Sequence, residues 1–202
     1  SPLPAVYTGE KMKAYRQWLG GNSYEVNASL GGSLYSERIE DYYLTPDDLG
    51  YGPFVKFDHD FIGREALEGK VNSTKRTKVT LVWDGDDFAR VFRSLSGTGK
   101  DIAKFIDLPL ANYASLPYDK VIRDGKIVGL STYTGYTYNE RAMISLAVVD
   151  RESSEPGTPV TVVWGEEGGG SKKPTVESHV QTEIRAIVSP VPYSEVAREH
   201  YA

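Results

Sequence analysis

The chain has 202 residues, a net charge of −5 and a sequence pI of about 5.3, and 40% of its residues are hydrophobic. These values are typical of a soluble globular protein and exclude a disordered chain. The acidic balance argues against a nucleic-acid partner, because the longest basic cluster is only Lys75, Arg76 and Lys78. No apolar run approaches the roughly 20 residues of a membrane helix, so we predict no membrane contact.

The sequence contains no cysteine, which excludes disulfides, thiolate nucleophiles and cysteine-ligated metals together. This composition fits a cytoplasmic protein. The first residue is Ser, and no signal segment with a charged start and an apolar centre follows it. The run Ser1–Pro4 resembles the middle of a longer sequence, so we interpret the start as an engineered boundary or a cleavage point.

Before residue 70 the sequence predicts short elements separated by loops. Apolar residues recur at helical spacing within Lys11–Leu19, and glycines end this predicted helix. Residues 24–35 predict either a strand that is broken at Gly31-Gly32 or a strand with a tight bend there. The acidic, tyrosine-rich residues 36–49 predict a loop.

A second strand and a second helix are predicted before a domain boundary. Gly52–Phe57 predicts the strand, and the Asp60 carboxylate predicts the N-cap of a helix over residues 61–67, because it can accept a bond from a free backbone N–H. A polar run then separates a first domain, residues 1–75, from a second, residues 76–202.

Beyond residue 75 the pattern changes to strands joined by turns. Alternating apolar residues predict a strand over Lys78–Trp83, and Asp86-Asp87 predict the cap of a short helix over residues 88–95. Asp124-Gly125 is a strong tight-turn signal that predicts a hairpin. The remaining predictions are the hairpin bounds Lys120–Thr134, strands at Ile144–Val149, Pro159–Trp164 and His179–Val188, and a flexible hairpin tip at Glu166–Lys173. The fold class is therefore α+β, with a partial α/β subdomain followed by a small antiparallel β-barrel or sandwich.

Three local motifs that could bind ions have simpler explanations. On a strand, His59 would point away from Asp58 and Asp60, so a metal site there is disfavoured. The acidic run 84–87 lacks the spacing of a calcium loop, and the run 97–100 lacks that of a phosphate loop. We predict no metal site.

The fourteen tyrosines are the one unusual count in the composition. A tyrosine offers a flat apolar face and a hydroxyl group, which suits stacking on an aromatic or pteridine ring. Tyrosines are also common on strand surfaces and at domain contacts. The residues alone therefore leave an aromatic cleft as one interpretation beside these ordinary roles. The tyrosines gather in two stretches, Tyr35, Tyr42, Tyr43 and Tyr51 in one and Tyr133, Tyr136 and Tyr138 in the other.

Two stretches carry a family resemblance when they are taken together. One runs from Leu34-Tyr35-Ser36 through Leu44-Thr45-Pro46 to Asp60-Phe61-Ile62-Gly63, and the other joins the hairpin Val121–Gly129 to the strand Ile144–Ala147. Their order and separation resemble the glycine-cleavage T-protein (aminomethyltransferase) superfamily. Four further runs are similar to its tetrahydrofolate-dependent vanillate and syringate O-demethylases. These runs are Ser29–Ser33, Asp41–Pro46, Phe57–Asp60 and Val163–Glu166.

The resemblance implies a methyltransferase that demethylates methoxylated aromatic acids and forms 5-methyltetrahydrofolate. Residues 1–75 would complete the middle domain of such an enzyme, with an insertion of the demethylase type, and residues 76–202 would be its carboxyl-terminal barrel. The catalytic residues would then lie upstream, and this chain alone would be inactive. Its partners would be folate and a small aromatic substrate. A homo-oligomer is also expected if strand edges are left unpaired.

Candidate contacts come from the resemblance and the tyrosine pattern together. We expect Tyr42, Tyr43 and Tyr51 to contact the aromatic substrate, and Tyr136 and Tyr193 to contact tetrahydrofolate. The family match near the carboxyl end is loose, so Tyr201 is the alternative to Tyr193. Two other functions stay open: an aminomethyltransferase of glycine cleavage, and a non-catalytic folate-binding or regulatory module.

Overall fold

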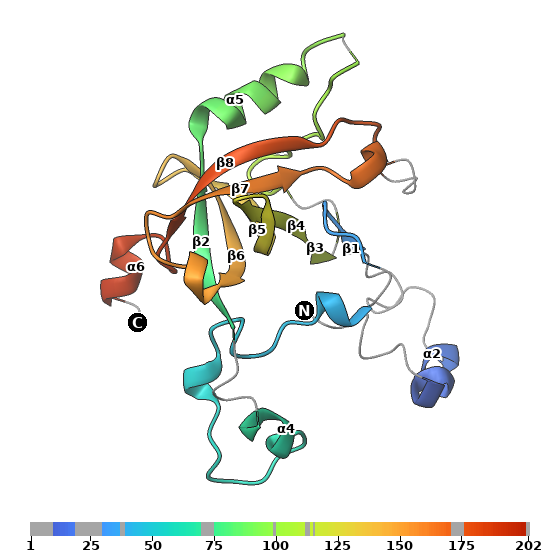
Figure 1. Cartoon of the computed structure of the whole chain (residues 1–202), viewed down its shortest axis with the longest axis vertical. Helices are drawn as coiled ribbons and strands as arrows, with labels where there is room; N and C mark the ends of the chain where they lie inside the picture. The colour runs from blue at the N-terminus through green and yellow to red at the C-terminus, as the bar shows by residue number, and fades with distance from the viewer. Residues whose placement is uncertain are drawn as a thin grey trace.

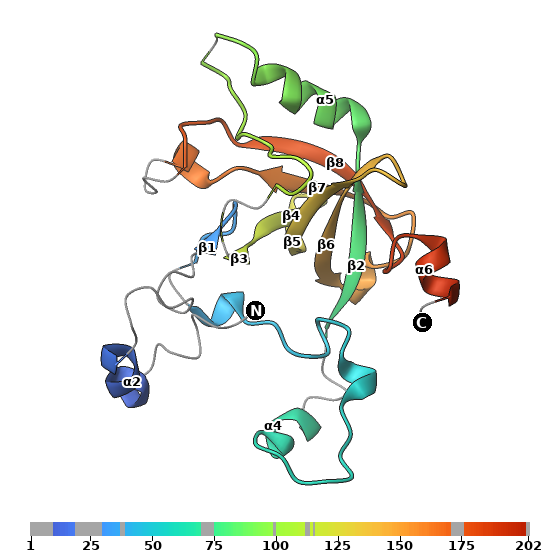
Figure 2. The ribbon, with the colours of Figure 1, turned by 180° about the vertical axis from the view of Figure 1, so that it is seen from behind.

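The structure is a computed structural model, shown in Figures 1 and 2. It describes residues 10–18, 30–36, 39–69, 75–98, 100–111, 114, 116–170 and 176–200. No helix in these ranges is long and apolar enough to cross a membrane.

Six antiparallel strands close into a barrel in the order β2-β6-β5-β4-β7-β8. Closure comes from β2, which pairs with β6 on one side and with β8 on the other. The predicted α+β class with a small antiparallel barrel is confirmed, and the barrel forms rather than the sandwich. The strands are β2 (Arg76–Trp83), β4 (Asp119–Arg123), β5 (Lys126–Thr137), β6 (Ala142–Asp150), β7 (Pro159–Trp164) and β8 (Thr182–Ser189).

The predicted tight turn joins β4 to β5. Asp124 has a φ of 50° and Gly125 a φ of 72°, so both central residues adopt the left-handed conformation that this turn needs. Arg123 and Lys126 pair directly across the turn. The predicted hairpin is therefore confirmed.

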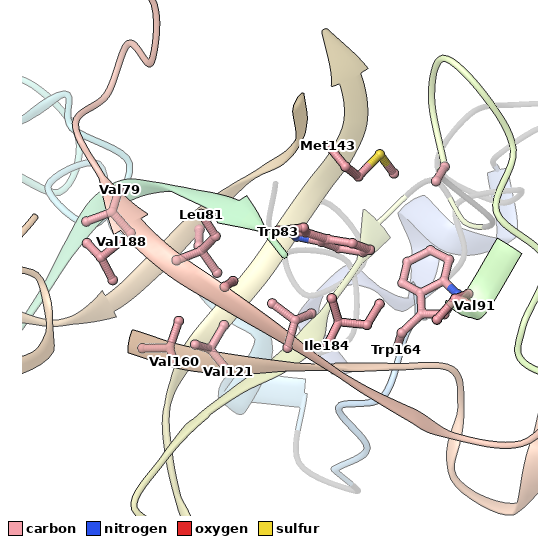
Figure 3. Close-up of a cluster of buried hydrophobic side chains, with 14 of the residues drawn as sticks. Val79, Leu81, Trp83, Val91, Val121, Met143, Val160, Trp164, Ile184 and Val188 are labelled. Atoms are coloured by element: carbon pink, nitrogen blue, oxygen red, sulfur yellow. The ribbon is translucent and has the colours of Figure 1, made fainter. Parts of the chain in front are cut away.

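The barrel interior is filled by apolar side chains from alternate strand positions. Trp83 and Trp164 meet edge to face with their ring centroids 5.6 Å apart, and Figure 3 shows them among valine, leucine and isoleucine side chains. The indole N–H of Trp83 donates to Ser145 Oγ at 3.1 Å, and that of Trp164 donates to the Lys104 carbonyl at 3.0 Å. Both buried donors are thus satisfied, which an apolar core requires.

Helix α5 (Gly85–Ser94) packs along β8 above the barrel in Figure 1. Its cap is Asp84, whose carboxylate accepts from the backbone N–H groups of Asp86 and Asp87. The predicted cap at Asp86-Asp87 is wrong, because the helix begins one turn earlier. Asp87 instead binds the β8 residue Arg185, with Nε 2.8 Å from Oδ2. That bond holds the pKa of Asp87 well below its usual range.

The elements outside the barrel are short. In Figures 1 and 2, α2 and α4 lie on the opposite side of the barrel from α5. Strands β1 and β3 pair in parallel. The elements are η1 (Glu10–Met12), α2 (Lys13–Trp18), β1 (Leu30–Gly31), η2 (Ile39–Tyr42), η3 (Gly52–Phe54), α4 (Arg64–Glu68), β3 (Leu116–Pro117), η4 (Arg151–Ser153), η5 (Glu167–Gly170) and α6 (Glu195–His200).

Two predictions before residue 70 are wrong. The predicted strand at 52–57 contains a 3-10 turn instead, with Pro53 fixing its first φ. Helix α4 begins at Arg64 after Gly63, whose φ is 92°, and no side chain caps it. The Asp60 carboxylate accepts a bond from Arg64 Nη1 at 3.0 Å rather than from a backbone N–H. The predicted helix end at Leu19 and the boundary at 70–74 lie outside the described residues.

Candidate functional site

Tyr42 lies in a buried apolar cluster on the outer face of the barrel. It is 6% exposed, and its ring meets the Tyr118 ring edge to face at a centroid distance of 5.5 Å. Its hydroxyl oxygen accepts from the Ser36 backbone N–H at 2.8 Å. Leu130 of β5 and Val148 of β6 complete the contact, so this ring holds the segment before β2 onto the barrel.

Tyr43 and Tyr51 lie on the same segment but are exposed, with 38% and 57% of their surface accessible. The segment is held to the barrel by an ion pair in which Arg76 Nη2 lies 3.0 Å from Asp48 Oδ2. Thr45 and Asp48 also exchange bonds, each side chain accepting from the backbone N–H of the other. The two exposed tyrosines are therefore presented by an ordered segment.

Tyr136 lies at the far end of β5. With Tyr133, Leu110 and Ile144 it lines a shallow pocket of about 170 Å³ on the outer face of β5 and β6. Tyr136 lies six positions after Leu130 along β5, which corresponds to a separation of roughly 20 Å in an extended strand. The structure thus places Tyr136 away from the Tyr42 cluster.

Tyr193 occupies a third position, between β8 and α6. Its carbonyl accepts from Arg198 Nη1 at 2.6 Å, and the same guanidinium donates to the Pro192 carbonyl at 2.8 Å. Tyr201 lies outside the described residues. The five predicted tyrosines therefore occupy three places on the barrel rather than one wall.

A buried polar cluster at one end of the barrel was not found by the sequence reasoning. Its members are Lys104, Glu166 and His179, which we call the buried triad. Lys104 is 2% exposed, Glu166 5% and His179 8%. Ionisable side chains are rarely buried to this degree unless they are paired.

Glu166 is the centre of the buried triad. Its Oε1 accepts from Lys104 Nζ at 2.8 Å and from the Gly32 backbone N–H at 3.1 Å. Burial raises the pKa of Glu166, but the bond and charge of Lys104 together with the Gly32 N–H outweigh it and leave that pKa lowered. The Lys104 ammonium also lies 5.2 Å from the Trp164 ring centroid. The pair is therefore ionic.

The two ring nitrogens of His179 have partners of opposite kinds. Its Nε2 lies 2.9 Å from the Glu166 backbone nitrogen, which can only donate, and its Nδ1 lies 2.8 Å from the Glu177 carbonyl, which can only accept. The imidazole therefore carries its proton on Nδ1 and accepts at Nε2. Close packing of glycines permits this contact, because a Cβ on Gly165 would lie 2.8 Å from the ring.

The triad fixes the segment that precedes the barrel. Gly32 binds Glu166, and the next residue, Ser33, donates its backbone N–H to Asp119 Oδ1 at 3.0 Å. Ser33 Oγ accepts from the Lys120 backbone N–H at 2.7 Å. Two buried carboxylates thus clamp residues 32–33 onto β4 and the end of β7.

Little in the sequence indicates the triad. The Val163–Glu166 run carries only a family resemblance, and residues 166–173 predict a flexible hairpin tip. Its described part instead turns through three left-handed glycines, Gly168, Gly169 and Gly170, against His179. An acidic residue directly after an apolar strand, followed by glycines, is the one local signal that the sequence offered.

The chain is similar in sequence to curated proteins, among them the following two. The chain is 52% identical over 203 residues to syringate O-demethylase of Sphingobium sp., a match that covers the whole chain and 44% of that protein. It is 34% identical over 168 residues to sesamin methylene transferase of Sinomonas sp., covering 78% of the chain and 35% of that protein. The chain is a sequence relative of syringate O-demethylase. It spans less than half the length of either relative.

The chain was also compared with family models and with solved structures. No family model matches the chain. The crystal structure of glycine cleavage system aminomethyltransferase T from Bartonella henselae matches 75% of the chain and 32% of that protein, with 15% identity and a TM-score of 0.45. The resemblance to O-demethylases that is predicted from the sequence is confirmed by the sequence match to syringate O-demethylase.

Proposed function

We propose that the chain forms part of a tetrahydrofolate-dependent methyltransferase that demethylates a methoxylated aromatic acid of the vanillate or syringate type, giving 5-methyltetrahydrofolate. The observation that carries the proposal is the 52% identity to syringate O-demethylase along the whole chain. The second relative, a methylene transferase, supports transfer of a one-carbon group. A cytoplasmic location fits a folate-dependent reaction.

Transfer of a methyl group from an aryl ether to folate has two requirements that a binding surface on this chain could help to meet. An aryl ether oxygen is a poor leaving group unless it is protonated or hydrogen-bonded as its methyl bond breaks. The methyl carbon must also lie in line with folate N5, away from water. The barrel would supply one wall that orients the two reactants, and the catalytic residues would belong to the part of the relatives that this chain does not match.

Within this proposal the contacts are the candidate tyrosines that are not buried. Tyr43 and Tyr51 would contact the aromatic substrate, and Tyr136 and Tyr193 the folate. Tyr42 would act indirectly, because its buried ring and its bond from Ser36 keep it in the cluster that positions Tyr43.

The test is detection of 5-methyltetrahydrofolate by mass spectrometry. The 202-residue chain, and any longer protein that contains it, is incubated with tetrahydrofolate and a panel of methoxybenzoates. We expect methylated folate and loss of one methyl group from vanillate, syringate or a relative with the longer protein only. No product from either protein across the panel would refute the demethylase proposal.

Variants then separate the tyrosine roles. Tyr43→Phe should raise the KM for the aromatic acid, and Tyr136→Ala should weaken folate binding. Tyr138→Phe is the matched control, because Tyr138 is 78% exposed on the same strand end as Tyr136. Unchanged kinetics and folate affinity in both Tyr43→Phe and Tyr136→Ala would remove these residues from the site while leaving the demethylase proposal standing.

A further inference from the structure

The buried triad contains an acceptor that is not used. Glu166 Oε1 takes both donors, Lys104 and the Gly32 N–H, whereas Oε2 is buried and has no hydrogen-bond partner. A buried carboxylate oxygen without a donor is an unfavourable arrangement in a folded protein. Glu166 Oε2 could therefore gain a hydrogen bond from a suitable donor.

A nitrogen that could act as that donor belongs to the His179 imidazole. His179 Nε2 lies 3.4 Å from Glu166 Oε2, and the His179 side chain has no exposed surface. In the neutral imidazole the Nε2 lone pair accepts from the Glu166 backbone N–H, so the ring offers Oε2 no proton. A proton on Nε2 would displace that N–H and allow the ring to donate to Oε2 in a charge-assisted hydrogen bond.

We propose that His179 Nε2 and Glu166 Oε2 form a buried proton-binding site, and that proton uptake there switches Nε2 from accepting the Glu166 backbone N–H to donating to the Glu166 carboxylate. The balance is simple: one proton is taken from solvent, no other bond is made or broken covalently, and the triad gains one positive charge. The Glu166 backbone N–H loses its acceptor in the same step.

Nearby groups act in opposite directions on the uptake of a proton by His179 Nε2. Among the residues that the structure describes, the titratable groups that face the imidazole are Glu166 from the turn after β7, Lys104 from the 100–111 segment and Glu177 from the segment of His179 itself. Burial and the Lys104 charge oppose a second positive charge. The Glu177 carbonyl accepts from Nδ1, and the negative charge of its side chain, which accepts from the Phe105 backbone N–H at 2.7 Å, favours the proton. The unbonded Glu166 Oε2 favours protonation of His179 Nε2, so whether this nitrogen takes up the proton depends chiefly on the Glu166 carboxylate.

The consequence would reach the segment before the barrel. Glu166 binds Gly32 through Oε1 and, in the protonated state, His179 through Oε2. A change in how the Glu166 turn is held is thus transmitted to residues 32–33 by a direct bond. Protonation acts as a switch on the clamp that connects this segment to the barrel.

The test is a pH titration of the ¹⁵N-labelled chain by long-range ¹H–¹⁵N spectra, which distinguish the two neutral tautomers from imidazolium. The chain has three histidines, so a His179→Gln spectrum assigns the signals. From about pH 8 to about pH 4 we expect His179 to begin with a protonated Nδ1 and then to gain a proton on Nε2 before the barrel unfolds. Exchange of the Glu166 amide, corrected for pH, should become about tenfold faster over the same range.

Glu166→Gln is the decisive variant. It removes the carboxylate charge but keeps the shape, and we expect the His179 midpoint to fall by about one pH unit. His59 and His200 are internal controls that should titrate identically in both proteins. A neutral His179 down to acid unfolding, a protected Glu166 amide throughout, or an unchanged midpoint in Glu166→Gln would each overturn the proposal. If the variant does not fold, the wild-type titration and amide exchange decide alone.

Discussion

The substitution Lys104→Met tests how much the buried triad contributes to stability. Methionine fills a similar volume beside Trp164 but removes the ammonium that lies 2.8 Å from Glu166 Oε1. The two side chains are 2% and 7% exposed, so little water can replace the lost partner. Glu166 keeps only the Gly32 N–H as a donor to its carboxylate.

Removing one partner of a buried ion pair costs about 3–5 kcal/mol, because the other charge remains buried without compensation. For a chain of this size that loss corresponds to a decrease in Tm of roughly 6–20 °C. The double variant Lys104→Met with Glu166→Gln should recover most of it, because a neutral amide needs no counter-charge and can still accept from Gly32. The two substitutions are therefore expected to be strongly non-additive.

The assay is urea unfolding at neutral pH, followed by fluorescence of the three tryptophans and by circular dichroism. Lys126→Met is the control, since Lys126 is exposed at the start of β5 and its loss should change stability by less than about 0.5 kcal/mol. A Lys104→Met variant within about 1 kcal/mol of wild type, or a double variant that loses the sum of the single losses, would refute the reasoning.

Two further predictions concern a glycine and an aspartate. Gly32→Ala should destabilise the protein far more than Gly157→Ala: both residues have a left-handed φ, 90° and 93°, but only at Gly32 would a Cβ meet a backbone oxygen, that of Tyr118 at 2.3 Å. Gly157→Ala should cost about 1–2 kcal/mol for the conformation alone, and equal losses in thermal unfolding would contradict the close-contact argument. Asp87 has a folded-state pKa below its unfolded value of about 3.9, so its bond to Arg185 contributes stability that is present above about pH 4 and is lost as the pH falls. Asp87→Asn should therefore flatten the loss of stability between about pH 4 and pH 2, and an unchanged slope would show that Asp87 is not the group responsible.

The sequence by itself determined the elements whose signal is local. Strand β7 is found at its predicted bounds, Pro159–Trp164, because alternating apolar residues between turn residues specify a strand without help from the rest of the chain. The Asp124-Gly125 turn was equally predictable, since few residues adopt a positive φ at both central positions. The resemblance to O-demethylases also came from the sequence alone, and the comparison confirmed it.

Only the tertiary structure decided which polar residues are buried together. Lys104, Glu166 and His179 are separated by up to 75 positions, and no spacing in the sequence brings them to one point. Tyr42 and Tyr43 are adjacent and were predicted to act alike, yet one is 6% exposed and the other 38%. The reason is physical: a strand or helix forms from its own backbone and side-chain period, whereas burial and ion pairing depend on where closure of the barrel places distant segments.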